Sequence, residues 1–444
     1  MGRRSHLRAL DVWMNGLLVG QWRLPAHGPM EFAYDTAWLA APERRPLSLS
    51  LPMNFDGVPL RGERVGNYFD NLLPDSEPIR RRLQSRFKTH SRNAFDLLTA
   101  IGRDCVGAVQ LLPPGTSPGD VFSTQVEPLD DGEIEHWLQR AASGDSAVTL
   151  HQDEEDFRIS IAGAQEKTAF IWHDGRWCRP LGATPTTHIF KLPLGLIGAR
   201  QADMHSSLEN EWLCAALLRA YGLPIANCTI AQFGAQKTLI VERFDRKKTA
   251  SGAYWLRLPQ EDFCQALGVP SSAKYEADGG PGLRAMAAIL RASETPEADV
   301  ATLLRAQLLF WMLAATDGHA KNFSLHLLAG GRYRLAPLYD VLSAWPVVGT
   351  GPNQLDYDKL RLAMAVRSRN PHYRMRDICR RHFLATAIQC GFGHDMESII
   401  EDTVQQTPAV IAQVSGMLPK GFPTHVFETI TQGLEKSAAR LANS

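Results

Sequence analysis

The side chains best suited to catalysis stand together in one short stretch, residues 314–323, with the sequence Ala-Ala-Thr-Asp-Gly-His-Ala-Lys-Asn-Phe. Its Asp317 and Asn322 have the D-x-x-x-x-N spacing of loops in which an aspartate accepts the proton of an attacking hydroxyl and an asparagine holds Mg²⁺ during phosphoryl transfer. This spacing is also common by chance. The simpler alternative is a turn in which Asp317 caps a backbone amide and Asn322 takes a left-handed conformation.

A second carboxylate, Asp340, follows a strand-like segment at residues 332–336. If that segment forms a hairpin with the chain after Asn322, the carboxylates of Asp340 and Asp317 come together. Two aspartates and an asparagine supply hard oxygen ligands for Mg²⁺ and leave room for phosphate oxygens. Taken alone, Asp340 is explained as well by a buried carboxylate that caps the next turn. Taken together, the three residues favour a metal site.

Phosphoryl transfer also needs a loop that covers the phosphates. The segment Ser160–Lys167 reads Ser-Ile-Ala-Gly-Ala-Gln-Glu-Lys, and its small residues would let backbone amides face phosphate oxygens. With one glycine it matches neither the Walker A loop nor G-x-G-x-x-G, so a plain hairpin is the alternative.

A lysine on a neighbouring strand is the other requirement, and Lys191 is the candidate. It alternates with apolar residues in His-Ile-Phe-Lys-Leu and therefore lies on one face of a predicted strand. A solvated surface lysine is the default interpretation. If Lys191 is buried it needs a charge partner, which Glu209 or Glu211 on the next predicted helix could supply.

Three charged segments lie outside this set. Glu242–Arg246 ends the sheet-rich region where a hinge would place backbone groups against an adenine, although a charged strand end is the simpler interpretation. Residues 367–382 hold six arginines and one aspartate, which suits phosphate contacts on nucleic acid or a solvated helix face. The arginine-rich stretch Arg80–Arg92 has the same two interpretations.

The elements that must position these residues can be predicted from local patterns. Asn15-Gly16 between two apolar runs predicts a hairpin over residues 9–22, and Asp75-Ser-Glu-Pro predicts a helix beginning near Glu77. Strand patterns occupy residues 157–161, 168–172, 187–192 and 238–243, with a helical pattern over 208–221. From about residue 259 the apolar residues recur with the helical period. Sheet-rich units are therefore expected to precede a helical one.

Composition excludes several classes of protein. The chain has 444 residues, of which 44% are hydrophobic and 21% charged, so it is neither disordered nor fibrous. Its formal net charge of zero argues against a protein that coats nucleic acid. Seven scattered cysteines without a C-x-x-C pair suggest neither disulfides nor zinc, and together with the lack of a long apolar run they predict a cytoplasmic protein.

Several stretches together resemble the HipA family, the serine/threonine-kinase toxins of HipBA toxin–antitoxin systems. The resemblance is nearly full length. It rests on Val12–Gly16, Arg45–Pro52, Phe69–Asp75, Ile101–Ala108, Ile161–Thr168, Val241–Arg246, Asp278–Gly282, Thr316–Asn322 and Arg381–Ala385. It implies an α+β, protein-kinase-like two-lobed fold. The expected units are a β-rich N-terminal subdomain at 1–145, a kinase N-lobe at 146–255 and a helical C-lobe at 256–444.

The same resemblance implies roles for individual residues. Asp317 is expected to be the catalytic base, Asn322 and Asp340 the Mg²⁺ ligands, and Ser160 a site of autophosphorylation that ejects the phosphate loop. A phosphate on Ser160 would place about two negative charges where ATP phosphates must sit. Whether His319 or Lys321 touches the γ-phosphate is left open. The residues expected to contact ATP are Ile161, Ala162, Gly163, Ala164, Gln165, Glu166, Lys191, Glu242, Phe244, His319, Asn322 and Asp340.

The resemblance further implies ATP and Mg²⁺ as cofactors and a translation-related protein substrate, glutamyl-tRNA synthetase in the family, whose phosphorylation arrests growth and favours persistence. The implied partners are a helix-turn-helix antitoxin of the HipB type and operator DNA, which Arg380 and Arg381 are expected to contact. Two alternatives remain: a catalytically weak corepressor that mainly binds antitoxin and DNA, and a small-molecule or lipid kinase with a similar loop.

Overall fold

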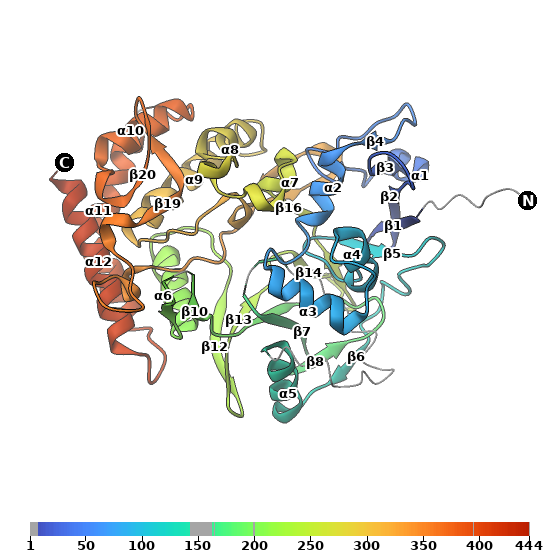
Figure 1. Ribbon diagram of the computed structural model, residues 1–444, viewed down its shortest axis with the longest axis horizontal. Coiled ribbons are helices and arrows are strands. Elements are labelled where there is room, and N and C mark those ends of the chain that lie inside the picture. The colour runs from blue at the N-terminus through green and yellow to red at the C-terminus, as the bar shows by residue number, and fades with distance from the viewer. Residues whose placement is uncertain (1–7, 143–161, 164, 199, 394, 444) are drawn as a thin grey trace, which may run out of the picture.

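The computed structural model describes residues 8–142, 162–163, 165–198, 200–393 and 395–443. Figure 1 shows the N-terminal sheet on the right, a second sheet below the centre, and the C-terminal helices on the left. The candidate residues Ser160, Ile161 and Ala164 lie outside the described residues, as does the strand expected at 157–161.

The N-terminal unit is a five-stranded antiparallel sheet in the order β4-β3-β2-β1-β5, accompanied by four helices. The β1–β2 hairpin confirms the prediction for residues 9–22, because Asn15 and Gly16 have φ angles of 48° and 83° at its turn. In the core, Trp22 stacks on Phe69 with 4.0 Å between ring centroids. The elements are β1 Arg8–Met14, β2 Leu17–Leu24, β3 Glu31–Tyr34, β4 Leu60–Arg61, β5 Val109–Leu112, α1 Thr36–Ala40, α2 Glu63–Asp70, α3 Glu77–Phe87 and α4 Ala94–Ile101.

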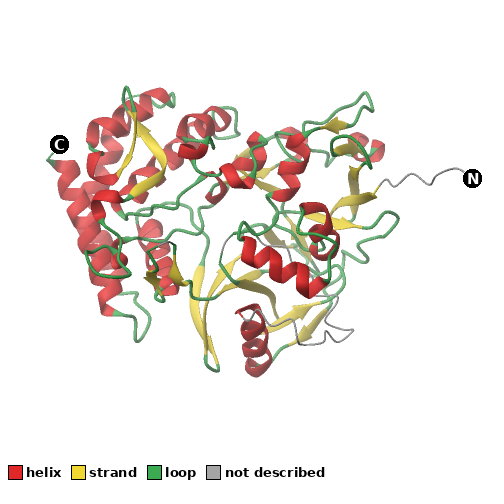
Figure 2. Cartoon of the chain, viewed as in Figure 1, coloured by secondary structure: helices red, strands yellow, loops and turns green. Residues whose placement is uncertain are grey.

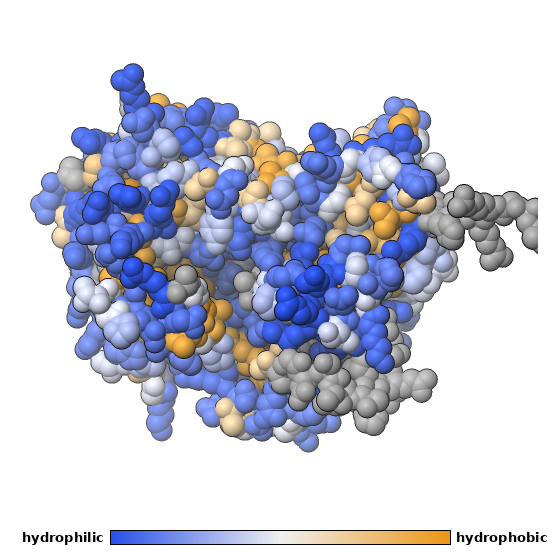
Figure 3. All heavy atoms as spheres, in the orientation of Figure 1, coloured by the Kyte–Doolittle hydropathy of each residue, from blue (hydrophilic) through white to orange (hydrophobic). Residues whose placement is uncertain are grey.

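Helix α3 begins where the sequence predicts a helix start. The Ser76 side chain accepts a hydrogen bond from the backbone N–H of Ile79, and a proline occupies the first turn. In Figure 3 a strongly hydrophilic patch near the centre of the visible face lies over α3. The visible side of this helix is therefore strongly polar.

The second sheet has six strands in the order β12-β13-β9-β7-β8-β6 (Figure 2). It includes β6, which precedes the predicted boundary at residue 146, and α5 packs against β7 and β12. The three predicted domain ranges stay a prediction. The elements are β6 Val126–Pro128, α5 Asp131–Ala142, β7 Lys167–His173, β8 Arg176–Pro180, β9 His188–Lys191, β10 Gly195–Ile197, β11 Ala202–Met204, α6 Ser207–Ala220, β12 Cys228–Phe233, β13 Gln236–Glu242, β14 Arg246–Lys248 and β15 Trp255–Arg257.

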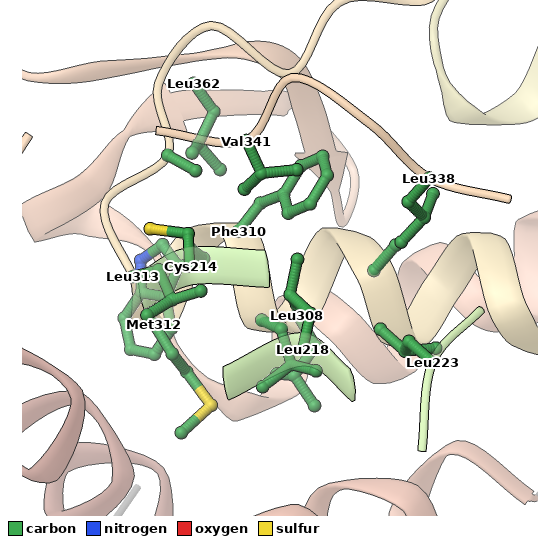
Figure 4. Packing of buried hydrophobic residues seen from close by; sticks show 14 of the residues in the cluster. Cys214, Leu218, Leu223, Leu308, Phe310, Met312, Leu313, Leu338, Val341 and Leu362 are labelled. Carbon is green, nitrogen blue, oxygen red and sulfur yellow. The ribbon is translucent and has the colours of Figure 1, made fainter. Parts of the chain in front are cut away.

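The C-terminal half is mainly helical, as its periodicity predicts, and β18 lies within the strand predicted at residues 332–336, but four further short strands, β16, β17, β19 and β20, were not predicted as strands. Helix α9 is buried nearly all round, and Figure 4 shows its Leu308 and Phe310 in the core with Leu218 of α6. The elements are β16 Gln260–Asp262, α7 Phe263–Leu267, α8 Leu283–Leu290, α9 Pro296–Met312, β17 Ser324–Leu327, β18 Tyr333–Leu335, β19 Arg361–Arg367, β20 Pro371–Arg374, α10 Arg380–Gln389, α11 Asp395–Ser415 and α12 Thr424–Ala442.

Helix length and polarity also bear on membrane insertion. None of the helices in the described ranges combines the length and the apolar character that crossing a bilayer requires.

Candidate active site

A cavity of about 200 Å³ lies where the six-stranded sheet meets residues 317–324, which we call the catalytic stretch because they include the candidate base Asp317. Its wall takes residues from all three predicted units of the chain. The predicted site residues that line it are Ala162, Gly163, Gln165, Lys191, Glu242, Phe244, Asp317, His319, Asn322 and Asp340. The fold therefore brings ten of the predicted residues to one place. Glu166 instead forms an ion pair with Arg82 of α3, at the edge of the phosphate-loop segment.

Lys191 is buried in the middle of the sheet, with 8% of its side chain exposed, and is not the surface lysine of the default interpretation. Its Nζ lies 2.6 Å from Oε1 of Glu211 and 2.6 Å from Oδ1 of Asp340. Of the two glutamates considered as partners, Glu211 is therefore the one in contact, whereas Glu209 pairs with Lys237. We call Lys191, Glu211 and Asp340 the Lys191 cluster.

The protonation of this cluster follows from burial and charge. Burial alone lowers the pKa of Lys191, but the carboxylates of Asp340 and Glu211 outweigh it and raise that pKa. Burial opposes ionisation of Asp340, yet the adjacent ammonium group lowers its pKa to about 2. Burial raises the pKa of Glu211, with Asp340 adding to the effect against the pull of Lys191. The ion pair at neutral pH is thus held chiefly between Lys191 and Asp340.

The β17–β18 hairpin places Asp340 beside the catalytic stretch, as the sequence predicts. Asp340 has a left-handed backbone with φ 61°, which turns the chain immediately after Tyr339. The Tyr339 hydroxyl lies 2.7 Å from the carbonyl oxygen of Lys321 and 2.6 Å from Oγ of Ser324. These contacts tie the Asp340 turn to the stretch that carries Asp317 and Asn322.

Asn322 closes the catalytic turn. It ends the short 3₁₀ helix Ala320–Asn322, so it does not have the left-handed backbone of the simpler alternative. Its Nδ2 donates to the carbonyl oxygen of Asp317 at 2.9 Å, which leaves the amide oxygen as its acceptor atom. The turn therefore presents one amide oxygen and one carboxylate to the cavity.

Asp317 stands at the mouth of the cavity with 65% of its side chain exposed. The Tyr275 hydroxyl donates to its Oδ1 at 2.5 Å, and Nε2 of His319 lies 4.0 Å from Oδ2. Burial lowers the pKa of His319, which favours the neutral imidazole. Within the described part of the chain, Nδ1 of His319 has no hydrogen-bond partner, so it is available to a ligand in the cavity.

A second group of charges lines the cavity and was not predicted as a site. Asp75, from the loop before α3, accepts from Nζ of Lys321 at 2.8 Å and from Nζ of Lys274 at 3.0 Å. We call these three residues the Asp75 cluster. Burial opposes ionisation of Asp75, but the two ammonium groups lower its pKa. Asp75 is the last residue of one of the stretches that carry the family resemblance. The sequence around it does not indicate which lysines it contacts.

The phosphate-loop segment contributes a further lysine that the prediction did not assign. Nζ of Lys167 donates to the carbonyl oxygen of Ala162 at 3.0 Å, and burial together with the charge of Lys191 lowers its pKa to about 8. Gly163 has φ 108°, and a Cβ there would lie 2.7 Å from Nζ of Lys167. Glycine at this position therefore lets the ammonium group approach the backbone of the loop.

The expected hinge forms an apolar wall of the cavity. Phe244 is half-buried, with ring centroids 5.7 Å from Tyr339 and 5.6 Å from His326. Glu242 is exposed and accepts from Nδ2 of Asn227 at 3.0 Å. The wall continues through Ile189 and Val241. A flat aromatic and aliphatic surface of this kind suits a purine ring.

Behind the hinge, a buried ion network joins it to the N-terminal unit. Asp104 accepts from Nη2 of Arg246 at 2.9 Å and Nε of Arg257 at 3.2 Å, while Arg243 pairs with Asp245 at 2.8 Å. The three arginines hold the pKa of Asp104 far below its usual range despite its burial. This network fixes the strand end that carries Glu242 and Phe244.

The arginine block at 367–382 does not reach the cavity. It spans the end of β19, β20 and the start of α10. Arg380 pairs with Glu397 and with Glu401 of α11, whereas Arg381 is exposed. The structure therefore places both predicted DNA-contact residues on the helical C-terminal half, away from the cavity.

The donor set fits a magnesium–nucleotide ligand. Among the described residues no three His, Cys, Asp or Glu side chains form a metal-binding group of their own. The carboxylate of Asp340 and the amide oxygen of Asn322 are nevertheless hard oxygen donors in one cavity, and Mg²⁺ is commonly bound by one or two carboxylates with phosphate oxygens and water. These two residues would hold the ion.

Comparison with known proteins covers both halves of the chain. Residues 159–411 match the family model of the HipA-like C-terminal domain, and residues 10–112 match that of the HipA N-terminal domain. Putative kinase Y4mE of Sinorhizobium fredii is 36% identical over 341 residues, which cover 76% of this chain and 77% of that protein.

Serine/threonine-protein kinase toxin HipA of Shewanella oneidensis is 28% identical over 347 residues, or 75% of each protein. Its solved complex with HipB and operator DNA matches this chain with a TM-score of 0.78 and 23% identity, covering 98% of this chain and 97% of that one. The predicted α+β, two-lobed fold is therefore confirmed, and so is the resemblance on which it rested.

Proposed function

Since the chain belongs to the HipA family, we propose that it is an ATP- and Mg²⁺-dependent serine/threonine-protein kinase that acts in the cytoplasm as the toxin of a type II toxin–antitoxin pair. The observation that carries the proposal is the Lys191 cluster, a buried lysine held between Glu211 and Asp340 in the cavity that Asp317 also lines. A lysine–glutamate pair and a metal-binding aspartate are the parts that protein kinases require together.

The chain's own residues account for the chemistry of transfer. Asp317 accepts the proton of the substrate hydroxyl as its oxygen attacks the γ-phosphorus of ATP, and ADP leaves. Lys191 orients the phosphates, while Phe244 and Val241 hold the base. His319, whose Nδ1 is unpartnered among the described residues, is better placed to meet the γ-phosphate than Lys321, which Asp75 holds. Mg²⁺ between Asn322 and Asp340 would neutralise the negative charge of the phosphates.

Replacing the catalytic base tests the proposal. Asp317→Ala should reduce phosphate transfer by about 10²–10⁴-fold, the usual contribution of a positioned base. Its side chain is largely exposed, so the melting temperature should not change. The assay follows labelled phosphate from ATP into the protein itself and into a cell extract. Asp402→Ala, which removes an exposed aspartate of α11 that is not in the cavity wall, is the control. Label incorporated at the wild-type rate by Asp317→Ala would refute the assignment.

Self-inactivation is proposed for Ser160, although that residue lies outside the described residues. Support comes from its neighbours Gly163 and Gln165, which line the cavity. After incubation with ATP, mass spectrometry should find a phosphate on Ser160 in the wild type and none in Asp317→Ala. An active protein in which Ser160 stays unmodified would rule out this form of control.

The proposed partners are a HipB-like antitoxin, operator DNA and an aminoacyl-tRNA synthetase of the glutamyl type, whose phosphorylation would arrest growth and favour persistence. The matching solved structure, which holds HipA, HipB and operator DNA, supports the first two. Because Arg380 is engaged by α11, Arg381 is the more available of the two arginines for DNA. An extract labelled with radioactive ATP should show a band of synthetase size.

The corepressor alternative predicts a different outcome in the same preparation. A protein that works only by docking would bind antitoxin and DNA without binding ATP. The buried Lys191 cluster argues against it, because removing charged groups from water is costly and a scaffold has no use for them.

A further inference from the structure

The hydrogen bond between Tyr275 and Asp317 is the feature of the cavity mouth that the proposed reaction does not yet use. The Tyr275 hydroxyl donates to Oδ1 of Asp317 at 2.5 Å, and it is the donor that reaches this carboxylate among the described residues. Asp317 lies on an exposed turn, where an aspartate side chain can adopt several rotamers. A donor fixed on one oxygen restricts that freedom and leaves Oδ2 for a second hydroxyl.

Tyr275 is itself held in place by its loop. Its carbonyl oxygen accepts from the backbone N–H of Asp278 at 3.1 Å and of Gly280 at 2.9 Å. Gly280 packs so closely that a Cβ would lie 2.0 Å from the carbonyl oxygen of Ala273, so only glycine fits there. The ring of Tyr275 packs edge-on against His319, with 5.2 Å between centroids.

The residue that follows Tyr275, Glu276, anchors the same loop to strand β19. The Glu276 carboxylate accepts from the backbone N–H of Ala365 at 2.7 Å and pairs with Arg367, both on β19. The hydroxyl of Tyr275 therefore projects from a backbone that is fastened at both its turn and its neighbour. A hydroxyl anchored in this way is suited to orienting a neighbouring side chain. It is less suited to a role in which it must move away during the reaction.

We propose that Tyr275 is a positioning residue for phosphoryl transfer, whose hydroxyl orients the Asp317 carboxylate so that Oδ2 faces the incoming serine or threonine hydroxyl. The inference rests on the proposed kinase function and deepens it. In general, a catalytic base works best when a third group fixes its orientation, and small misplacements of a reacting group reduce rates by large factors. Tyr275 acts through Asp317 and takes no part in bond making.

The test removes the hydroxyl alone. Tyr275→Phe keeps the ring against His319 and should lower kcat about tenfold for the phosphorylation of dephosphorylated casein, with KM for ATP and for casein within about twofold of wild type. Tyr333→Phe is the matched control, because the Tyr333 hydroxyl donates to the carbonyl oxygen of Ile289 at 2.9 Å elsewhere in the same half of the protein. It should leave kcat unchanged.

A double-variant cycle separates positioning from a general structural effect. In an Asp317→Asn background, where the base is already lost, adding Tyr275→Phe should leave the residual rate unchanged. An equal loss in both backgrounds, or a loss accompanied by a lower melting temperature, would overturn the proposal. So would a kcat for Tyr275→Phe that matches or exceeds wild type, since a higher rate means that the hydroxyl competes with the acceptor. If wild-type protein labels neither casein nor itself, it is the kinase function that fails.

Discussion

The Lys191 cluster and the Asp75 cluster both contribute side chains to one cavity. The first consists of one lysine and two carboxylates, and the second of one carboxylate and two lysines. In direct contacts, Lys191 meets two carboxylates, whereas Asp75 meets the ammonium groups of Lys274 and Lys321. The first places the carboxylate of Asp340 where it can bind a cation. The second places the ammonium groups of Lys274 and Lys321 where they can bind a phosphate. One cavity therefore offers both kinds of group to a ligand that carries a cation and phosphates together, as a magnesium–nucleotide does.

The two clusters also differ in the parts of the chain they join. The Lys191 cluster links the second sheet, α6 and the turn after β18. The Asp75 cluster links the catalytic stretch to the loop before α3 in the N-terminal unit. The N-terminal unit therefore supplies a charged residue to the cavity wall, and the C-terminal two thirds of the chain would lack it.

The largest expected effect comes from removing the shared lysine of the first cluster. Lys191→Ala leaves the carboxylates of Glu211 and Asp340 without their cation, so phosphate transfer should fall about 10²–10⁴-fold, as when a central catalytic group is lost. Breaking a buried ion pair typically costs about 3–5 kcal/mol of unfolding free energy, and partial exposure of Asp340 places this case at the lower end.

Lys359→Ala is the control for that variant, because Lys359 also pairs with a carboxylate, that of Asp356, but is 70% exposed. It should cost less than about 1 kcal/mol in urea unfolding and leave activity intact. Equal losses of unfolding free energy and of activity in the two variants would mean that the burial of Lys191 has no special role.

A smaller effect is expected from the second cluster. Asp75→Asn keeps the shape of the side chain but removes the carboxylate that pairs with Lys274 and Lys321, so it weakens the tie between the catalytic stretch and the N-terminal unit. We expect kcat/KM to fall roughly tenfold, as for a displaced catalytic loop. Asp70→Asn, which affects the neighbouring pair with Arg80 outside the cavity wall, should leave kcat/KM within about twofold. The reverse ranking of these two variants would contradict the role given to the Asp75 cluster.

The smallest effect is a loss of stability at acidic pH. Lys191 lowers the pKa of Asp340 in the folded protein to about 2, whereas an aspartate in the unfolded chain has a pKa of about 4. As the pH falls, the unfolded chain therefore binds a proton at this carboxylate before the folded protein does. The contribution of Asp340 to stability is therefore complete above about pH 4 and is lost as pH falls toward 2. Asp340→Asn should flatten the stability–pH curve in that window, as measured by urea unfolding. An unchanged slope would mean that the ion pair does not persist in solution.

Local sequence patterns predicted the elements of the fold well where a backbone requirement was visible. Asn15-Gly16 indicates its turn because both residues accept positive φ, and Ser76 with Pro78 indicates the start of α3. Strand β18 was predicted from residues 332–336, whereas β16, β17, β19 and β20 were missed because they lie in a region of helical period. Strand β16 also depends on pairing with β17, a distant segment of the chain.

Residue type and spacing predicted most of the site residues, but they did not predict which side chains contact one another. Asp317, Asn322, Asp340 and Lys191 follow from spacing and residue type, and Glu211 was one of two candidates. Asp75 and Tyr275 could not be assigned from spacing, because each reaches the catalytic stretch from a distant part of the chain and nothing local shows which group it meets.

Calorimetric titration of the full chain with ATP, with and without Mg²⁺, measures directly whether the cavity binds a magnesium–nucleotide. We expect that ATP binds, that Mg²⁺ strengthens binding at least tenfold, and that Asp340→Asn abolishes this gain while Asp358→Asn, at an exposed position, retains it. No binding of ATP, or binding of equal strength with and without Mg²⁺ in all three proteins, would contradict the assignment of this cavity to a magnesium–nucleotide.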